Sequence, residues 1–130
     1  MYTIEKRDFG FELTFGDFIN ADEMERWLED ARKALAVTPK EFGVFVDMRT
    51  LKPLPPDSQK AMEEGQRLFK LKGMSRSVVV LNSATVTAQF KRIAKETGIY
   101  QWERYIDSSS KKDWLEIGRK WLTHAIDPDK

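Results

Sequence analysis

The chain has 130 residues, of which 22 are Lys or Arg and 21 are Asp or Glu, and it contains no cysteine. We expect residues 1–130 to form one domain, because a chain of this length buries about two thirds of the surface that its unfolded form exposes. The balanced charge argues against binding to nucleic acid, and the lack of cysteine excludes disulfides, thiolate nucleophiles and cysteine metal sites.

No apolar signal-peptide core follows the first methionine, and the longest aliphatic run, residues 78–81, is far shorter than the roughly 20 residues of a membrane span. The sequence therefore predicts a cytoplasmic protein without an integral membrane segment.

The first third of the chain predicts a β-hairpin and a helix. Residues 2–8 are a plausible short strand, and residues 11–15 alternate apolar and polar side chains, as a strand with one buried face does. Asn20 followed by Glu23 has the spacing of a helix start. An apolar stripe at helical spacing then predicts a helix that ends near Ala36, before Thr38-Pro39.

The chain is organised around residues 42–58, FGVFVDMRTLKPLPPDS. The apolar run at residues 44–46 is typical of a strand covered on both faces. Three prolines hold the following connection extended, and Asp57 or Ser58 is a natural cap for the next helix. Gly65 interrupts the apolar stripe of that helix, so we expect close packing against the sheet there, and Gly73 ends the helix.

The C-terminal half repeats the strand-helix unit. We expect a buried strand at residues 77–81, a helix from Asn82-Ser83 to Gly98, a polar edge strand at residues 101–107, a last helix, and a frayed tail at residues 127–130. The fold class is therefore α/β: a mostly parallel sheet of about five strands, with an N-terminal β-hairpin and four helices joined by right-handed crossovers.

This order of elements resembles the fold of STAS domains and bacterial anti-sigma-factor antagonists, the SpoIIAA-like group. The segments FGVFVDMRTL, SRSVVVLNS and ERYID look like small bacterial STAS/SEC14-type proteins, and the likeness spans nearly the whole chain. In the antagonists, phosphorylation of a serine at the start of the helix after the central strand switches partner binding. The resemblance implies a non-enzymatic regulatory module that binds a protein partner through Asp47, Arg49, Asp57 and the switch residue Ser58. A plain helix cap is the alternative for Ser58.

The wider STAS/SEC14-type resemblance implies a second function, a small carrier of an apolar or lipid-like ligand. Aromatic residues that could line its cavity are Trp27, Phe69, Phe90, Trp102, Trp114 and Trp121. The alternative is that these side chains are ordinary core residues.

Polar side chains follow several of the predicted strands. Because open parallel sheets bind ligands beyond the carboxyl ends of their strands, we expect a crevice formed by Asp47, Arg49, Asn82, Ser83 and Asp107. Asp47 and Arg49 are two residues apart, so they can pair. The sequence has no HExxH, phosphate-loop or GxSxG motif, and we predict no enzymatic activity, no cofactor and no metal. An enzyme that uses the crevice at Asp47 and Arg49 is the third alternative.

Two charged clusters leave alternatives open. Lys70, Lys72 and Arg76 surround Gly73 and could bind an acidic partner or a lipid head group, or form a solvated helix end. Glu103-Arg104 indicates an edge strand that uses charge against aggregation, or equally a contact of a homodimer.

Overall fold

The computed structural model describes residues 1–38 and 40–130. Its elements follow the expected order, with one short 3-10 helix in addition: β1 (Tyr2–Arg7), β2 (Gly10–Phe15), α1 (Ala21–Ala34), β3 (Phe42–Met48), α2 (Pro56–Lys72), β4 (Met74–Leu81), α3 (Ala84–Thr97), η1 (Tyr100–Trp102), β5 (Glu103–Asp107) and α4 (Trp114–His124). The sheet has the strand order β1-β2-β3-β4-β5. Among the strands of residues 1–38 and 40–130, β1 and β2 form the one antiparallel pair, so the predicted α/β class and mostly parallel sheet are confirmed.

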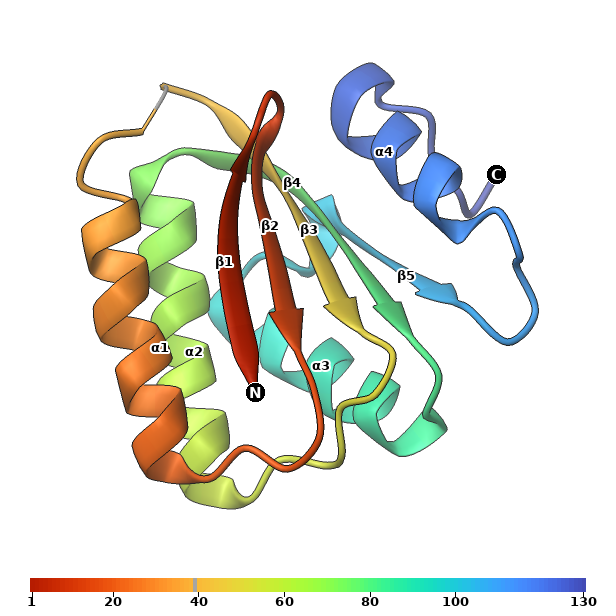
Figure 1. The fold of residues 1–130 in the computed structure, drawn as a ribbon. Helices are drawn as coiled ribbons and strands as arrows, with labels where there is room; N and C mark the ends of the chain where they lie inside the picture. The colour runs from red at the N-terminus through yellow and green to blue at the C-terminus, as the bar shows by residue number, and fades with distance from the viewer. Residues whose placement is uncertain (39) are drawn as a thin grey trace.

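Helices cover both faces of the sheet (Figure 1). The larger core lies under α1, α2 and α3 and includes Val44 and Val46 of β3, whereas Phe45 between them belongs to a smaller core under α4. Alternate residues of β3 therefore meet opposite layers, since successive strand side chains point to opposite faces. This double cover explains why the central strand is continuously apolar.

The ends of the helices follow local rules. Asn20 caps α1 by accepting a 2.9 Å hydrogen bond from the Glu23 N–H. The helix ends at Ala34, two residues before the expected position, and Pro39, which the sequence analysis placed after it, lies outside the described residues. Gly73 ends α2 in the left-handed region, with φ of 119°, as glycine without a Cβ can.

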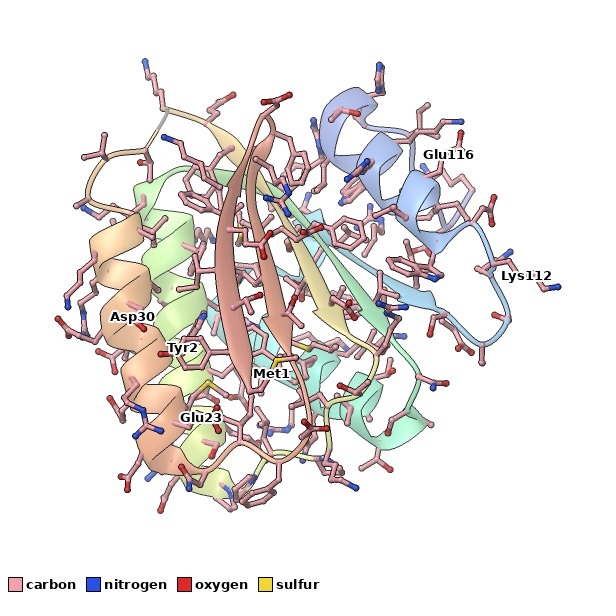
Figure 2. All side chains as sticks on the ribbon, in the orientation of Figure 1. Met1, Tyr2, Glu23, Asp30, Lys112 and Glu116 are labelled. Carbon is pink, nitrogen blue, oxygen red and sulfur yellow. The ribbon has the colours of Figure 1, made fainter. Side chains whose placement is uncertain are left out.

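β1 is fixed to α1 by side chains (Figure 2). The Tyr2 hydroxyl donates a 2.5 Å hydrogen bond to Asp30, which raises the pKa of Tyr2 to about 12. The Met1 ammonium lies 3.1 Å from the Glu23 carboxylate and donates to the Gly16 carbonyl. These contacts hold the edge strand of the hairpin against the first helix.

Three expectations need correction. The last strand begins at Glu103, because residues 100–102 form the 3-10 helix η1. The tail, which was expected to be free, contacts β5: both carboxylate oxygens of Asp127 accept hydrogen bonds from Arg104 at 2.9 and 3.0 Å. Gly65 does mark close packing, but against Trp27 of α1 and not against the sheet.

Candidate functional site

Two loops meet at the carboxyl end of the sheet and are hydrogen-bonded to each other. Asp17, after β2, makes both hydrogen bonds with its backbone: its carbonyl accepts from the Lys52 N–H, and its N–H donates to the Thr50 carbonyl, both at 3.0 Å. Asp17 has φ of 60°, a left-handed conformation that residues other than glycine seldom adopt. Such strain persists only where the surroundings enforce it. The two hydrogen bonds therefore hold the β2–α1 loop in an otherwise unfavourable shape.

We call the two backbone hydrogen bonds of Asp17 the clamp. The residue that follows the clamp, Phe18, lies on the surface. Phe18 is 57% exposed, while its neighbour Ile19 is 1% exposed and belongs to the core. Further exposed side chains come from the loop after β3, Lys52 and Pro53, and from the first two residues of α2, Pro56 and Asp57. We call these five residues, Phe18 included, the loop surface.

The backbone of the loop after β3 is anchored inward at Leu54. The Leu54 N–H donates to Gln89 at 2.9 Å, and the Leu54 carbonyl accepts from the side chains of Gln59 and Gln89 at 2.8 and 3.1 Å. Leu54 itself is buried. An ordered loop loses little conformational freedom when it binds something.

Ser58 is not the cap of α2. The helix begins at Pro56, its N-cap is Pro55, and no side chain of the described part of the chain caps it. Proline suits the first helical position, because its fixed φ is helical and its missing N–H has no partner to lose. Ser58 is consequently the third helical residue; it is fully buried, and its hydroxyl donates a 2.9 Å hydrogen bond to the Ile19 carbonyl.

Of the other partner-binding candidates, Asp57 lies exposed in the first turn of α2, whereas Asp47 and Arg49 bind each other. Arg49 donates to both carboxylate oxygens of Asp47, from Nε at 3.0 Å and from Nη2 at 2.9 Å. Its guanidinium also lies 4.2 Å from the centre of the Trp114 ring. This pair links the end of β3 to the start of α4, and its role in partner binding stays a prediction.

The remaining crevice residues do gather. Asn82, Ser83 and Asp107 line one surface pocket of about 440 Å³, together with Lys91 and other residues of α3 and β5. Ser83 already caps α3, accepting from the Val86 N–H. The hydroxyl and N–H of Ser109 donate to Asp107 and hold its pKa below the ordinary value. Asp47 and Arg49 do not line this pocket, so the five-residue crevice is divided.

The predicted ligand cavity is small. Trp27, Phe69 and Phe90 line an apolar cavity of about 30 Å³ between the helices and the sheet, and Trp102 lies elsewhere, half exposed at the surface. A cavity of this size holds about one or two water molecules. Trp114 and Trp121 belong to the smaller core under α4.

Sequence reasoning missed a buried acid beside this cavity. Glu103 is 4% exposed and accepts hydrogen bonds from the hydroxyls of Ser77, at 2.8 Å, and Tyr105, at 2.6 Å. Burial raises the pKa of Glu103 to about 7, although both hydrogen bonds act to lower it. Glu103 is therefore not a surface charge that protects the edge, as the sequence suggested. The side chain of its neighbour Arg104 points to the opposite face of the sheet, toward Trp121.

The described residues offer no metal centre: within residues 1–38 and 40–130, no three His, Asp or Glu side chains gather as ligands. None of the helices in the same part of the chain combines the length and the apolar character that crossing a membrane requires. No protein-family model, no curated protein and no solved structure matches this chain.

Proposed function

We propose that this chain is a non-enzymatic regulatory module of the STAS/SpoIIAA-like kind that binds a protein partner in the bacterial cytoplasm. The observation that supports this best is Phe18, 57% exposed on a backbone clamped in a left-handed conformation at Asp17. A large aromatic side chain held at a rigid position is a frequent anchor of protein interfaces. Residues in sparsely populated backbone conformations, such as Asp17, cluster at functional positions.

The surroundings of Phe18 fit the rim of such an interface. Lys52 and Asp57 are exposed and carry opposite charges, and Pro53 and Pro56 restrict the backbone between and beside them. We expect the partner to offer an apolar pocket for the Phe18 ring, with polar or charged groups around it.

Phosphorylation of Ser58 stays a separate prediction. Because the Ser58 hydroxyl is buried and bound to Ile19, a kinase would reach it only after the first turn of α2 had opened. The loop surface does not depend on that step. The alternative function, a carrier of an apolar or lipid-like ligand, gains less support, since the core cavity of about 30 Å³ is far smaller than a lipid.

The experiment is affinity capture from a bacterial extract with three forms of the protein: the natural chain, Phe18→Ala and Leu71→Ala. Leu71 is a matched control, because it is also an exposed apolar side chain, 82% exposed, but lies near the end of α2. We expect a protein retained by the natural chain and by Leu71→Ala, and bound roughly tenfold or more weakly by Phe18→Ala. Equal retention by all three forms would contradict the proposal.

A further inference from the structure

The end of the molecule opposite to the loop surface carries exposed bases. Each of α1, α2 and α3 leads from the carboxyl end of one parallel strand to the amino end of the next, so all three helices end at the amino end of the sheet. The last turn of α2 contains Lys70 and Lys72, and Lys40 lies between α1 and β3. All three lysines are exposed. The proposed partner site uses none of them.

Contacts between the segments show that these lysines are neighbours. A Cβ at Gly73 would lie only 2.3 Å from the Lys40 carbonyl oxygen, so the segment before β3 passes directly over the end of α2. Lys70 reaches the loop after α3, where its Nζ donates to the Gly98 carbonyl at 3.1 Å. Trp102 of η1 lines the same surface pocket as Lys70. The ends of α2 and α3 and the segment before β3 therefore form one continuous surface (Figure 1).

Apolar side chains on this surface face water. Leu71, between the two lysines of α2, is 82% exposed, and Trp102 is 49% exposed. Val37, 79% exposed, joins them because α1 packs against α2 and both helices end here. The helix dipole accounts for lysines at a helix end, but not for exposed apolar side chains among them. We call six residues the basic end: Val37, Lys40, Lys70, Leu71, Lys72 and Trp102.

Charge is distributed unevenly between the two ends of the sheet. Glu41 is an exposed acid at the basic end and offsets one of its lysines. Arg76 is not part of this surface, because its guanidinium packs 5.6 Å from the centre of the Trp121 ring, under α4. The acids that begin helices, such as Asp22 and Asp57, lie at the other end. The molecule is therefore polarised, although its net charge is only +1.

We propose that the basic end binds the surface of an anionic membrane, with its lysines against lipid phosphates and its apolar side chains between the head groups. Each lysine next to an anionic bilayer adds to the attraction. Tryptophan favours the boundary between membrane and water, and aliphatic side chains gain free energy by leaving water. A protein is the less suitable occupant, because lysine is depleted in protein interfaces.

This orientation leaves the loop surface free. Phe18 follows the carboxyl end of β2, so a chain bound through its basic end presents Phe18 on the side away from the bilayer. Membrane binding and partner binding therefore use different residues, and each can fail without the other. An extract cleared of membranes keeps Leu71→Ala a valid control for Phe18→Ala.

The test is flotation of the full chain with vesicles of equal parts phosphatidylglycerol and phosphatidylcholine, compared with vesicles of phosphatidylcholine alone. We expect roughly tenfold or tighter binding to the anionic vesicles at low salt. Binding should weaken at about 1 M ionic strength, where the Debye length is about 3 Å. Lipid chains brominated near the head groups should quench tryptophan fluorescence of the natural chain, and this quenching should be lost in Trp102→Phe.

Variants separate the charge from the apolar contact. Lys40→Gln and Lys72→Gln should each weaken binding to the anionic vesicles roughly three- to tenfold at low salt. Leu71→Gln should weaken it by a similar factor at low and at high salt, because its contribution does not depend on charge. Lys52→Gln and Phe18→Gln alter an exposed lysine and an exposed apolar residue of the loop surface, and these matched controls should change nothing.

The proposal is overturned if the chain does not float with about 1 mM anionic lipid, a concentration that would detect even weak binding. It is equally overturned if both kinds of vesicle bind equally well, if quenching persists in Trp102→Phe, or if the controls weaken binding as much as Lys72→Gln and Leu71→Gln do. Binding to heparin without binding to the vesicles would identify an acidic macromolecule as the occupant and would also overturn it.

Discussion

The benzo ring of Trp27 fills the space that a side chain at Gly65 would occupy. A Cβ at residue 65 would lie 2.2 Å from Cζ3 and 2.3 Å from Cη2 of Trp27. Trp27 also stacks on Phe69, with ring centres 6.0 Å apart and planes 5° from parallel, and meets Phe15 edge to face. The approach of α1 to α2 therefore depends on the absence of a side chain at one position.

Gly65→Ala tests this packing. Alanine has the better helix propensity by about 1 kcal/mol, but the added methyl must displace a rigid ring that is 1% exposed, and overpacking costs about 1–3 kcal/mol or more. We expect a net loss of unfolding free energy, measured by urea denaturation. Lys60→Ala, on the exposed side of the same helix, should change stability by less than about 0.5 kcal/mol. A gain in stability for Gly65→Ala would show that the Trp27 ring can move aside at little cost in free energy.

The buried carboxyl of Glu103 should make stability depend on pH. Its pKa is raised from 4.5 to about 7 in the folded protein, so the folded state binds a proton more tightly than the unfolded state does. Its favourable contribution is then complete below about pH 4.5 and is lost as the pH rises through about 7, a difference of about 3 kcal/mol at most.

Glu103→Gln removes this titration and keeps a group that can bond to Ser77 and Tyr105. Denaturation of both forms between pH 4.5 and 8.5 should show a stability difference that grows in favour of the variant with rising pH. The difference isolates Glu103, because the other ionisable groups are common to both proteins. A pH-independent difference would mean that the pKa of Glu103 is the same in the folded and the unfolded protein.

Ser58 should behave as a core residue. Ser58→Ala leaves the Ile19 carbonyl without its hydrogen bond and should cost about 1–2 kcal/mol. Ser58→Asp places a carboxylate at a fully buried position next to that carbonyl, and we expect it to unfold the first turn of α2 or the whole domain. Thermal denaturation and circular dichroism measure both effects. A stable, natively folded Ser58→Asp would instead favour a phosphoswitch that the fold tolerates.

The ion pair between Arg104 and Asp127 should hold the C-terminal tail. Arg104 lowers the pKa of Asp127 to about 2, so the pair persists above that pH and is lost as the pH falls toward it. Asp127→Asn should release the tail, visible as faster amide exchange at Asp129, whose N–H donates to the Asp127 carboxylate. Asp113→Asn removes an exposed acid near α4 and should leave that exchange unchanged. Unaltered exchange in Asp127→Asn would mean that other contacts fix the tail.

The sequence correctly predicted the strands and helices that show a periodic pattern of apolar residues. The alternation in β2, the continuous run in β3 and the apolar stripes of the helices each report a local pattern that folding preserves. The predicted start of α2 is wrong by two or three residues, because Pro56 begins the helix and does not extend the connection before it. Counted from there, Ser58 shares a helical face with Met62 and Phe69, so its burial could have been read from the spacing.

The candidate sites depended on tertiary contacts that no local pattern contains. The sequence does not show that Phe18 is exposed, because its position depends on the backbone hydrogen bonds between Asp17 and the loop after β3. Glu103 and Arg104 are adjacent acid and base in a short strand, and the sequence does not tell which face each side chain meets. The hydroxyl groups of Ser77 and Tyr105, which make the burial of Glu103 tolerable, come from two different strands.

The sheet places its five strands side by side in the order in which they occur along the chain. No strand has to insert between two others, so each one can join an edge that its predecessor has just formed. Each crossover from one parallel strand to the next (residues 16–41, 49–73 and 82–102) contains a helix and leads to the neighbouring strand. The chain entropy of closing these segments is therefore lost in separate steps, one crossover at a time. Assembly can then proceed in one direction, from the hairpin outward, with α4 closing over β3, β4 and β5 as the final step.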